Sequence, residues 1–109
     1  MRGEYLKGHL DLLLLAALKV APGHGYAIID QLFELSDGAF DLPEGTIYPA
    51  LHRLERDGLV QSRWDTSTGR RRRIYELTAR GRKALLDQGR DWSTLHTAVN
   101  AVLRVAASS

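Results

Sequence analysis

The sequence predicts a mainly α-helical fold that carries one small β-hairpin. Apolar residues recur at helical spacing in three segments of the N-terminal half. Two short runs of β-forming residues then flank a turn rich in Ser, Thr and Gly, and a long final segment regains helical spacing. With 109 residues, the chain is long enough for a single core with one protruding element.

The amino-acid composition favours a folded soluble domain over a disordered, membrane-spanning or disulfide-bonded protein. Hydrophobic residues make up 44% and charged residues 26% of the chain, which is ordinary for a folded soluble domain and argues against disorder. The longest apolar run, residues 12–18, is far shorter than the roughly 20 residues of a membrane span. The N-terminus lacks the residue order of a secretion signal, and the absence of cysteine excludes disulfides and thiolate metal sites. We therefore expect a cytoplasmic protein without a membrane partner.

The first two helices are predicted at residues 6–20 and 24–36. The leucines of the first segment follow the spacing of one helix face, and Ala21-Pro22-Gly23 ends it. In the second segment apolar residues again supply one face. Ser36-Asp37-Gly38 ends that helix, because glycine suits the left-handed residue that follows many helices.

A third helix is predicted at residues 44–57, where Ile47, Leu51 and Leu54 share one face. Pro49 would break the interior of a helix, but near the first turn its missing N–H has no intrahelical partner to lose. The helix is therefore expected to begin only a few residues before Pro49.

A β-hairpin is expected next. Residues 59–65 and 72–77 have the composition of strands, and residues 66–69 that of a turn. The tip and the returning strand carry four consecutive arginines, Arg70–Arg73. On a strand these side chains would alternate, so that two of the four would face the same side.

The last helix is predicted from Thr78, a favourable N-cap residue, to about Val105. Gly89 interrupts its apolar pattern, which leaves a kink open at this position. The apolar seam has nearly heptad spacing and consists of Leu85, Trp92, Leu95, Val99 and Val102. Such a face has too few partners in so small a domain, which predicts pairing with a second copy of the chain. The alternative is that the helix folds back onto its own domain.

Three helices followed by a hairpin are the layout of a winged helix-turn-helix, in which the hairpin is the wing. The sequence therefore predicts a winged helix-turn-helix at residues 1–77 and a long C-terminal dimerisation helix at residues 78–109, joined in one compact unit. The distribution of charge along the chain agrees with this layout. Residues 52–83 hold ten basic and four acidic residues, whereas the rest of the chain holds five basic and nine acidic residues. The basic excess lies on the third helix and the wing, which favours a polyanionic partner. The alternative is a solvated basic loop.

Five stretches of the chain match one family of proteins. They are residues 7–18, 24–28, 69–72 and 75–81 and, most specifically, GTIYPALHRLERDGL at residues 45–59. On these residues the chain resembles the PadR family of transcriptional regulators, in its small type with a single C-terminal dimerisation helix. The resemblance covers nearly the whole chain. It implies a homodimeric winged-helix repressor whose affinity for its operator falls when a ligand binds.

DNA contacts are expected from the third helix and the wing, because hydroxyl, imidazole and guanidinium groups donate to phosphates and base edges. The residues expected to bind double-stranded DNA are Thr46, Tyr48, His52, Arg53, Arg70, Arg71, Arg72 and Lys7. The resemblance implies phosphate contacts for Thr46 and Tyr48. Alternatively, Tyr48 packs its ring in the core with only its hydroxyl exposed, and Arg53 pairs with Asp57. Two recognition helices in successive major grooves, about 34–36 Å apart, predict an inverted-repeat operator.

Trp92 has the clearest second role. In drug-responsive members of the family that the chain resembles, a tryptophan at the matching place stacks on flat aromatic ligands. The resemblance thus implies a small aromatic effector, with Trp92, Trp64 and His96 as candidate ligand contacts. The alternative is a tryptophan that belongs only to the dimer core.

Catalysis and metal binding have no support in the sequence. No motif of nucleophile, phosphate-loop or zinc-protease chemistry occurs, and the four histidines form no i, i+4 pair. We therefore expect neither an enzyme nor a cofactor nor a metal site. The rival functions are a winged-helix module that binds a ligand or a protein without reading DNA, and an RNA-binding winged helix.

Overall fold

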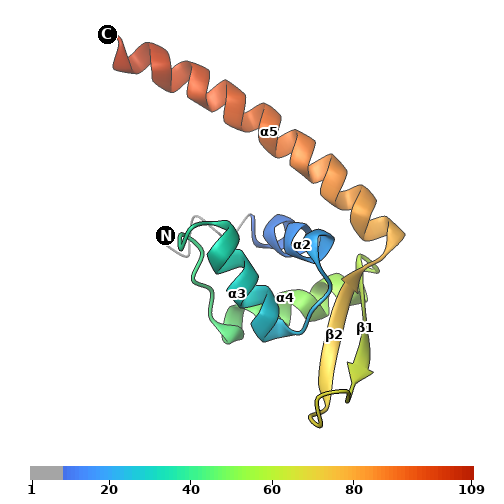
Figure 1. The fold of residues 1–109 in the computed structure, drawn as a ribbon. Helices are drawn as coiled ribbons and strands as arrows, with labels where there is room; N and C mark the ends of the chain where they lie inside the picture. Colours follow the sequence, from blue (N-terminus) through green and yellow to red (C-terminus); the bar gives the residue numbers. More distant parts are fainter. Residues whose placement is uncertain (1–8) are drawn as a thin grey trace.

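Three short helices, a two-stranded hairpin and one long helix follow one another along the chain (Figure 1). The computed structural model describes residues 9–109. The elements are α2 (Leu10–Val20), α3 (Gly25–Leu35), α4 (Glu44–Arg56), β1 (Val60–Asp65), β2 (Arg72–Leu77) and α5 (Ala79–Ala107). The predicted fold class is confirmed, and the bounds agree to within about two residues wherever both ends are described. The first residues of the helix predicted at 6–20, and Lys7 among the predicted DNA contacts, lie outside the described residues.

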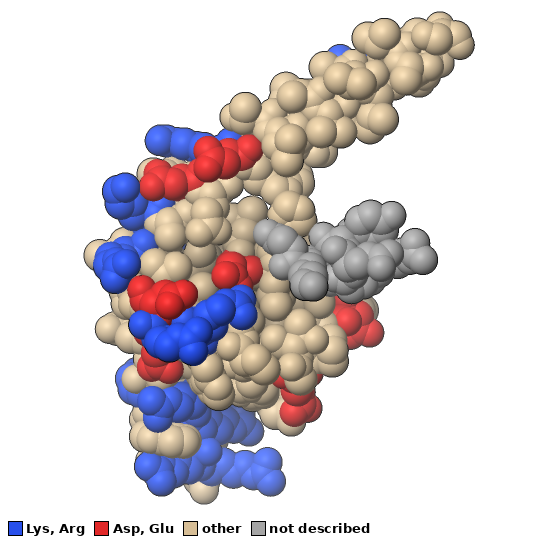
Figure 2. Space-filling model, turned by 180° about the vertical axis from the view of Figure 1, so that it is seen from behind, with Lys and Arg blue, Asp and Glu red and all other residues tan. Residues whose placement is uncertain are grey.

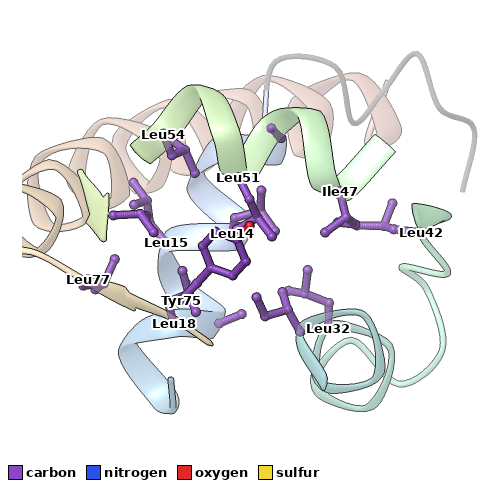
Figure 3. Close-up of a cluster of buried hydrophobic side chains, with 14 residues drawn as sticks. Leu14, Leu15, Leu18, Leu32, Leu42, Ile47, Leu51, Leu54, Tyr75 and Leu77 are labelled. Atoms are coloured by element: carbon purple, nitrogen blue, oxygen red, sulfur yellow. The ribbon is translucent and has the colours of Figure 1, made fainter. Parts of the chain in front are cut away.

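The core lies where α2, α3 and α4 converge on β2 (Figure 3). Leu14 and Leu51 have no exposed surface, and Tyr75 places its ring among the leucines from β2. The backbone of Tyr75 also closes the domain, because its N–H donates to the Gly23 carbonyl at 2.9 Å and its carbonyl accepts from the Gly23 N–H at 3.0 Å. The turn between α2 and α3 is thereby joined to the hairpin, which sets the position of the wing relative to the helices.

Helix α4 has the amphipathic character that its spacing predicts. Its buried face consists of Ile47, Ala50, Leu51 and Leu54. Pro49 lies in the second turn rather than the first, so that its missing N–H removes one helical bond, to the carbonyl of Gly45. Both residues are exposed, and water can therefore satisfy this carbonyl.

The start of α5 packs against the turn between α4 and β1. Thr78 caps the helix, because its Oγ1 accepts from the Gly81 N–H at 3.0 Å and donates to the Gly58 carbonyl at 2.7 Å. Gly81 itself is buried. A Cβ at this position would collide with the carbonyl oxygen of Leu59 and lie 3.2 Å from Cδ2 of Leu77. The close approach of α5 to this turn therefore requires glycine at residue 81.

Gly81→Ala should lower the free energy of unfolding by about 1–3 kcal/mol, because the backbone has to shift to relieve overpacking. Gly89→Ala is the matched control in the same helix, since nothing lies within 4 Å of the added Cβ. It should instead raise stability by up to about 1 kcal/mol through helix propensity. Urea denaturation measures both variants against wild type. Equal destabilisation by the two substitutions would contradict the packing described at Gly81.

Helix α5 runs unbroken through Gly89 and projects from the rest of the molecule (Figure 1), so that the kink left open by the sequence does not occur. The helix does not fold back, because residues 91–109 are all exposed in the single chain. Within the predicted seam, Leu85 packs against the chain's own core. The other seam residues are 41–68% exposed: Trp92, Leu95, Val99 and Val102. Neither α5 nor any other helix of residues 9–109 is long and apolar enough to cross a membrane.

Candidate nucleic-acid interface

Basic side chains gather at one end of the molecule, on and around the hairpin. Figure 2 shows them clustered there, whereas the outer part of α5 carries almost no charge. Arg70 and Arg71 precede β2 and are exposed, while Arg72 and Arg73 begin the strand and are half-buried. The strand begins at Arg72, as the sequence predicts, so the alternation expected on a strand applies to Arg72 and Arg73 and not to Arg70 and Arg71.

Arg73 is tied to its own domain. Its Nε donates to Oγ of Ser62 at 2.8 Å, Ser62 donates to the Glu55 carboxylate on α4, and Nη2 of Arg73 lies 3.9 Å from that carboxylate. The guanidinium of Arg73 also lies 4.9 Å from the Trp64 ring centroid, and that of Arg71 lies 4.1 Å from it. Arg73 thus fixes the wing to α4, and Trp64 holds Arg71 through a cation–π contact.

The outer face of α4 carries the residue types that bind DNA. Thr46 and His52 are exposed, and Tyr48 is half-buried. The Tyr48 ring packs against the edge of the core and over Gly25, where an added Cβ would lie 2.7 Å from Cε1. The ring of Tyr48 is therefore packed, as expected by the alternative in which only the hydroxyl of this residue is exposed. Tyr48 also lines a surface hollow. Burial, followed by the nearby Glu44 carboxylate, raises the pKa of the Tyr48 hydroxyl, which keeps it a proton donor.

This hollow has a volume of about 420 Å³ and lies between the start of α3, helix α4 and the wing. It is lined by His24, Tyr26, Tyr48, Arg70, Arg71, Arg72 and Arg73. Phenol, imidazole and guanidinium groups all donate hydrogen bonds, so the lining suits a phosphate group. Sequence analysis did not name His24 and Tyr26 as DNA contacts, although both lie in the stretch 24–28 that carries the family resemblance, at the start of the helix that precedes α4.

His24 connects α3 to the wing. Its Nδ1 lies 3.3 Å from the Ala27 N–H as the N-cap of α3, and its Nε2 lies 3.0 Å from Nη1 of Arg72. A neutral imidazole has one acceptor nitrogen, so that His24 accepts from one of these two donors at a time. Arg72 can therefore leave His24 for a phosphate while the imidazole caps α3.

Arg53 has a different partner from the one considered from the sequence. Its Nη2 donates to Oδ1 of Asp11 on α2, rather than to Asp57 one turn further along α4. The two side chains keep 43% and 40% of their surface exposed. An ion pair this exposed contributes only about 0–1 kcal/mol, so Arg53 can exchange Asp11 for a phosphate at low cost.

A second hollow, of about 350 Å³, lies between α2 and α5. Trp92 lines it together with Leu12 and Leu95. The Trp92 ring also stacks on His96, with centroids 4.7 Å apart and an interplanar angle of 13°. The structure thus brings together Trp92 and His96, which are two of the three candidate ligand contacts. Trp64 is separated from them, because it lies on β1 in the wing (Figure 1).

Comparison with known proteins connects this geometry with a single family. A profile described as the transcriptional regulator PadR-like family matches residues 14–87, from α2 to the first part of α5. The transcriptional regulator Rv3488 of Mycobacterium tuberculosis is 47% identical over 57 residues, which are 52% of this chain and 53% of that protein.

Solved structures of regulators are similar over most of the chain. A transcriptional regulator from Clostridium thermocellum has a TM-score of 0.82 at 26% identity, with 90% of this chain and 96% of that chain covered. A PadR family transcription regulator from Clostridium difficile R20291 has a TM-score of 0.78 at 33% identity, with 87% and 98% covered. With its winged-helix fold and the match over residues 14–87, the chain belongs to the PadR-like family of transcriptional regulators.

Proposed function

We propose that this chain is a homodimeric repressor that binds an inverted-repeat operator in double-stranded DNA. Its family consists of transcriptional regulators and not of enzymes, so that its chemistry is binding. The observation that carries the proposal is the exposed face of α4 beside the arginine-rich wing at one end of the molecule (Figure 2). Such a regulator acts on the chromosome, which places it in the cytoplasm.

Helix α4 acts as the recognition helix and enters the major groove. Thr46 and His52 are exposed along it, and the ion pair of Arg53 with Asp11 is a weak surface pair, so all three can reach phosphates or base edges. The hollow between Tyr48 and Arg70–Arg72 receives a backbone phosphate. Contacts of this kind release counterions, so affinity should fall steeply with salt.

The second copy of the chain docks through α5. The exposed apolar side chains of this helix would otherwise stay in water, and burying them contributes about 25 cal/mol per Å². A twofold pair of chains presents two α4 helices to one face of the duplex, and half-sites one helical turn apart then form an inverted repeat. Residues 1–77 are the DNA-binding part and residues 78–109 the dimerisation helix.

Selection of duplexes from a random pool by the full-length chain tests this function. The enriched sequences should contain two half-sites in inverted orientation, with centres about 10–10.5 base pairs apart. Raising the salt concentration from round to round suppresses nonspecific binding, so that the pool is enriched in duplexes that are bound sequence-specifically. A pool that stays random through successive rounds would contradict sequence-specific recognition.

A flat aromatic effector is proposed for the hollow between α2 and α5. Trp92 offers a ring for stacking, and Leu12 and Leu95 offer apolar contact. Because the hollow joins the winged-helix part to the dimerisation helix, a ligand there would change the separation of the two α4 helices. A coupling of about 1–3 kcal/mol corresponds to a 5- to 150-fold change in operator affinity.

Trp92→Leu should remove the response to such a ligand, because leucine keeps apolar volume on α5 but cannot stack. Trp64→Leu is the matched control and leaves Trp92 as the single tryptophan, since the chain has two. With riboflavin as a flat fused-ring probe, Trp64→Leu should retain fluorescence quenching and release of a labelled operator duplex. Equal quenching and release in both variants would place the ligand elsewhere.

A further inference from the structure

His24 lies where the start of α3 meets the wing. Backbone pairing of Gly23 with Tyr75 holds this end of α3 beside β2. The imidazole is half-buried and lines, together with Arg72, the hollow between α3, α4 and the wing, which we call the phosphate hollow. One ring nitrogen faces the helix and the other faces the wing, because Nδ1 lies 3.3 Å from the Ala27 nitrogen and Nε2 lies 3.0 Å from Nη1 of Arg72.

Two N–H donors converge on this imidazole, and the ring cannot satisfy both. A neutral imidazole has one acceptor nitrogen, and a protonated imidazole has none. When Nδ1 accepts from Ala27, Nε2 carries the hydrogen and faces the N–H of Arg72, which is also a donor. When Nε2 accepts from Arg72 instead, Nδ1 carries the hydrogen and the Ala27 N–H loses its capping partner. His24 therefore supplies an acceptor for only one of the two donors.

An anion in the phosphate hollow would remove this conflict. The free oxygens of a phosphodiester only accept hydrogen bonds, so they can take the N–H of Arg72 and the Nε2–H of His24 together, while Nδ1 caps α3. Charge also favours an anion here, because none of the ion pairs within residues 9–109 includes Arg70, Arg71 or Arg72. The arrangement of donors around the imidazole thus fits a bound phosphate better than an empty hollow.

We propose that His24 binds the DNA backbone directly, by donating its Nε2–H to the phosphate in the hollow while its Nδ1 caps α3. This inference rests on the proposed function, because the phosphate belongs to the operator duplex. The two tasks of His24 are separable, since the cap uses one ring nitrogen and the phosphate bond uses the other. Because a phosphate contact carries no sequence information, the bond should strengthen binding to operator and to scrambled duplex alike.

Two substitutions in the full-length chain separate these tasks. His24→Ser keeps a favourable N-cap but has no donor that reaches the phosphate. It should unfold at the same urea concentration as wild type, yet bind operator and scrambled duplex at least about tenfold more weakly, because a hydrogen bond to a charged group is lost. His24→Gln caps poorly but carries an amide N–H about as far from its Cα as the imidazole Nε2–H. It should unfold at a lower urea concentration and recover most of the affinity that His24→Ser loses.

An altered duplex identifies the phosphate. Each backbone phosphate of the selected operator is replaced in turn by an uncharged methylphosphonate, and affinity is measured by fluorescence anisotropy. At one position in each half-site, the replacement should weaken wild-type binding but weaken His24→Ser much less, because both changes remove the same bond. His52→Ser is the matched control on α4, and it should stay as sensitive as wild type to this replacement, since His52 does not line the hollow.

Three results would overturn the phosphate bond. They are wild-type affinity in His24→Ser, losses of affinity that follow the stabilities of the two variants, and a methylphosphonate profile of His24→Ser that is parallel to that of wild type. Each would assign His24 to the cap alone, and operator binding by wild type would leave the proposed function standing. If wild type binds neither operator nor scrambled duplex, the proposed function and this inference fail together.

Discussion

Val99→Glu combined with Val102→Glu should convert the protein to monomers and abolish operator binding. The two valines are 45% and 68% exposed in the single chain and belong to the apolar seam of α5. In a paired helix they would be buried, and each glutamate would then lack water and a partner, at a cost of several kcal/mol per charge. Loss of the second chain also removes bivalency, which lowers apparent affinity by about 10²- to 10⁴-fold.

Sedimentation velocity at micromolar concentration, together with binding to the selected operator, measures both effects. Thr97→Glu is the matched control, because successive helix residues turn by about 100° and place residue 97 on the side opposite the seam. This variant should stay dimeric and keep its operator affinity. A double glutamate variant that remained dimeric would show that the seam of α5 is not the interface.

Replacing Arg70, Arg71 and Arg72 together by alanine should weaken binding to every duplex, specific or scrambled. These arginines lie at or beside the phosphate hollow, and each phosphate contact contributes about one unit to the slope of log affinity against log salt. Because a dimer carries two wings and therefore loses six arginines, the slope should become shallower by up to about five units. Arg73 stays in place because it joins the wing to Glu55 and Ser62.

A second triple variant controls for net charge. Replacing Arg80, Arg82 and Lys83 by alanine removes the same three charges from the start of α5, where all three side chains are exposed. The salt slope of this variant should stay close to that of wild type. Equal slopes for the two triple variants would mean that the wing contributes only general positive charge and makes no phosphate contacts.

The order of elements follows from local patterns, which is why it can be predicted. Apolar spacing marks the face of α4, and the turn composition at residues 66–69 separates β1 from β2. Thr78 caps α5 as its residue type suggests. Each of these features depends on neighbours within a few residues, so the sequence alone contains the information.

The side-chain partners of the site depend instead on tertiary contacts. Asp57, one turn along α4, is the local candidate for Arg53, but packing of α2 against α4 brings Asp11 closer, 42 residues away in sequence. In the same way, Tyr48 finds its place over Gly25 only when α3 and α4 pack. No periodicity within one segment reports such contacts, and the roles of His24 and Tyr26 were missed for that reason.

Fluorescence anisotropy of the full chain on duplex DNA from upstream of its own gene, against a scrambled duplex over a salt series, tests sequence-specific recognition most directly. Two α4 helices and two wings on one dimer predict tight binding that weakens steeply with salt and prefers the native sequence by about 10³-fold or more. Equal, weak binding to both duplexes would contradict operator recognition in this upstream DNA: either the operator lies elsewhere, or the chain is a winged-helix module that does not read DNA.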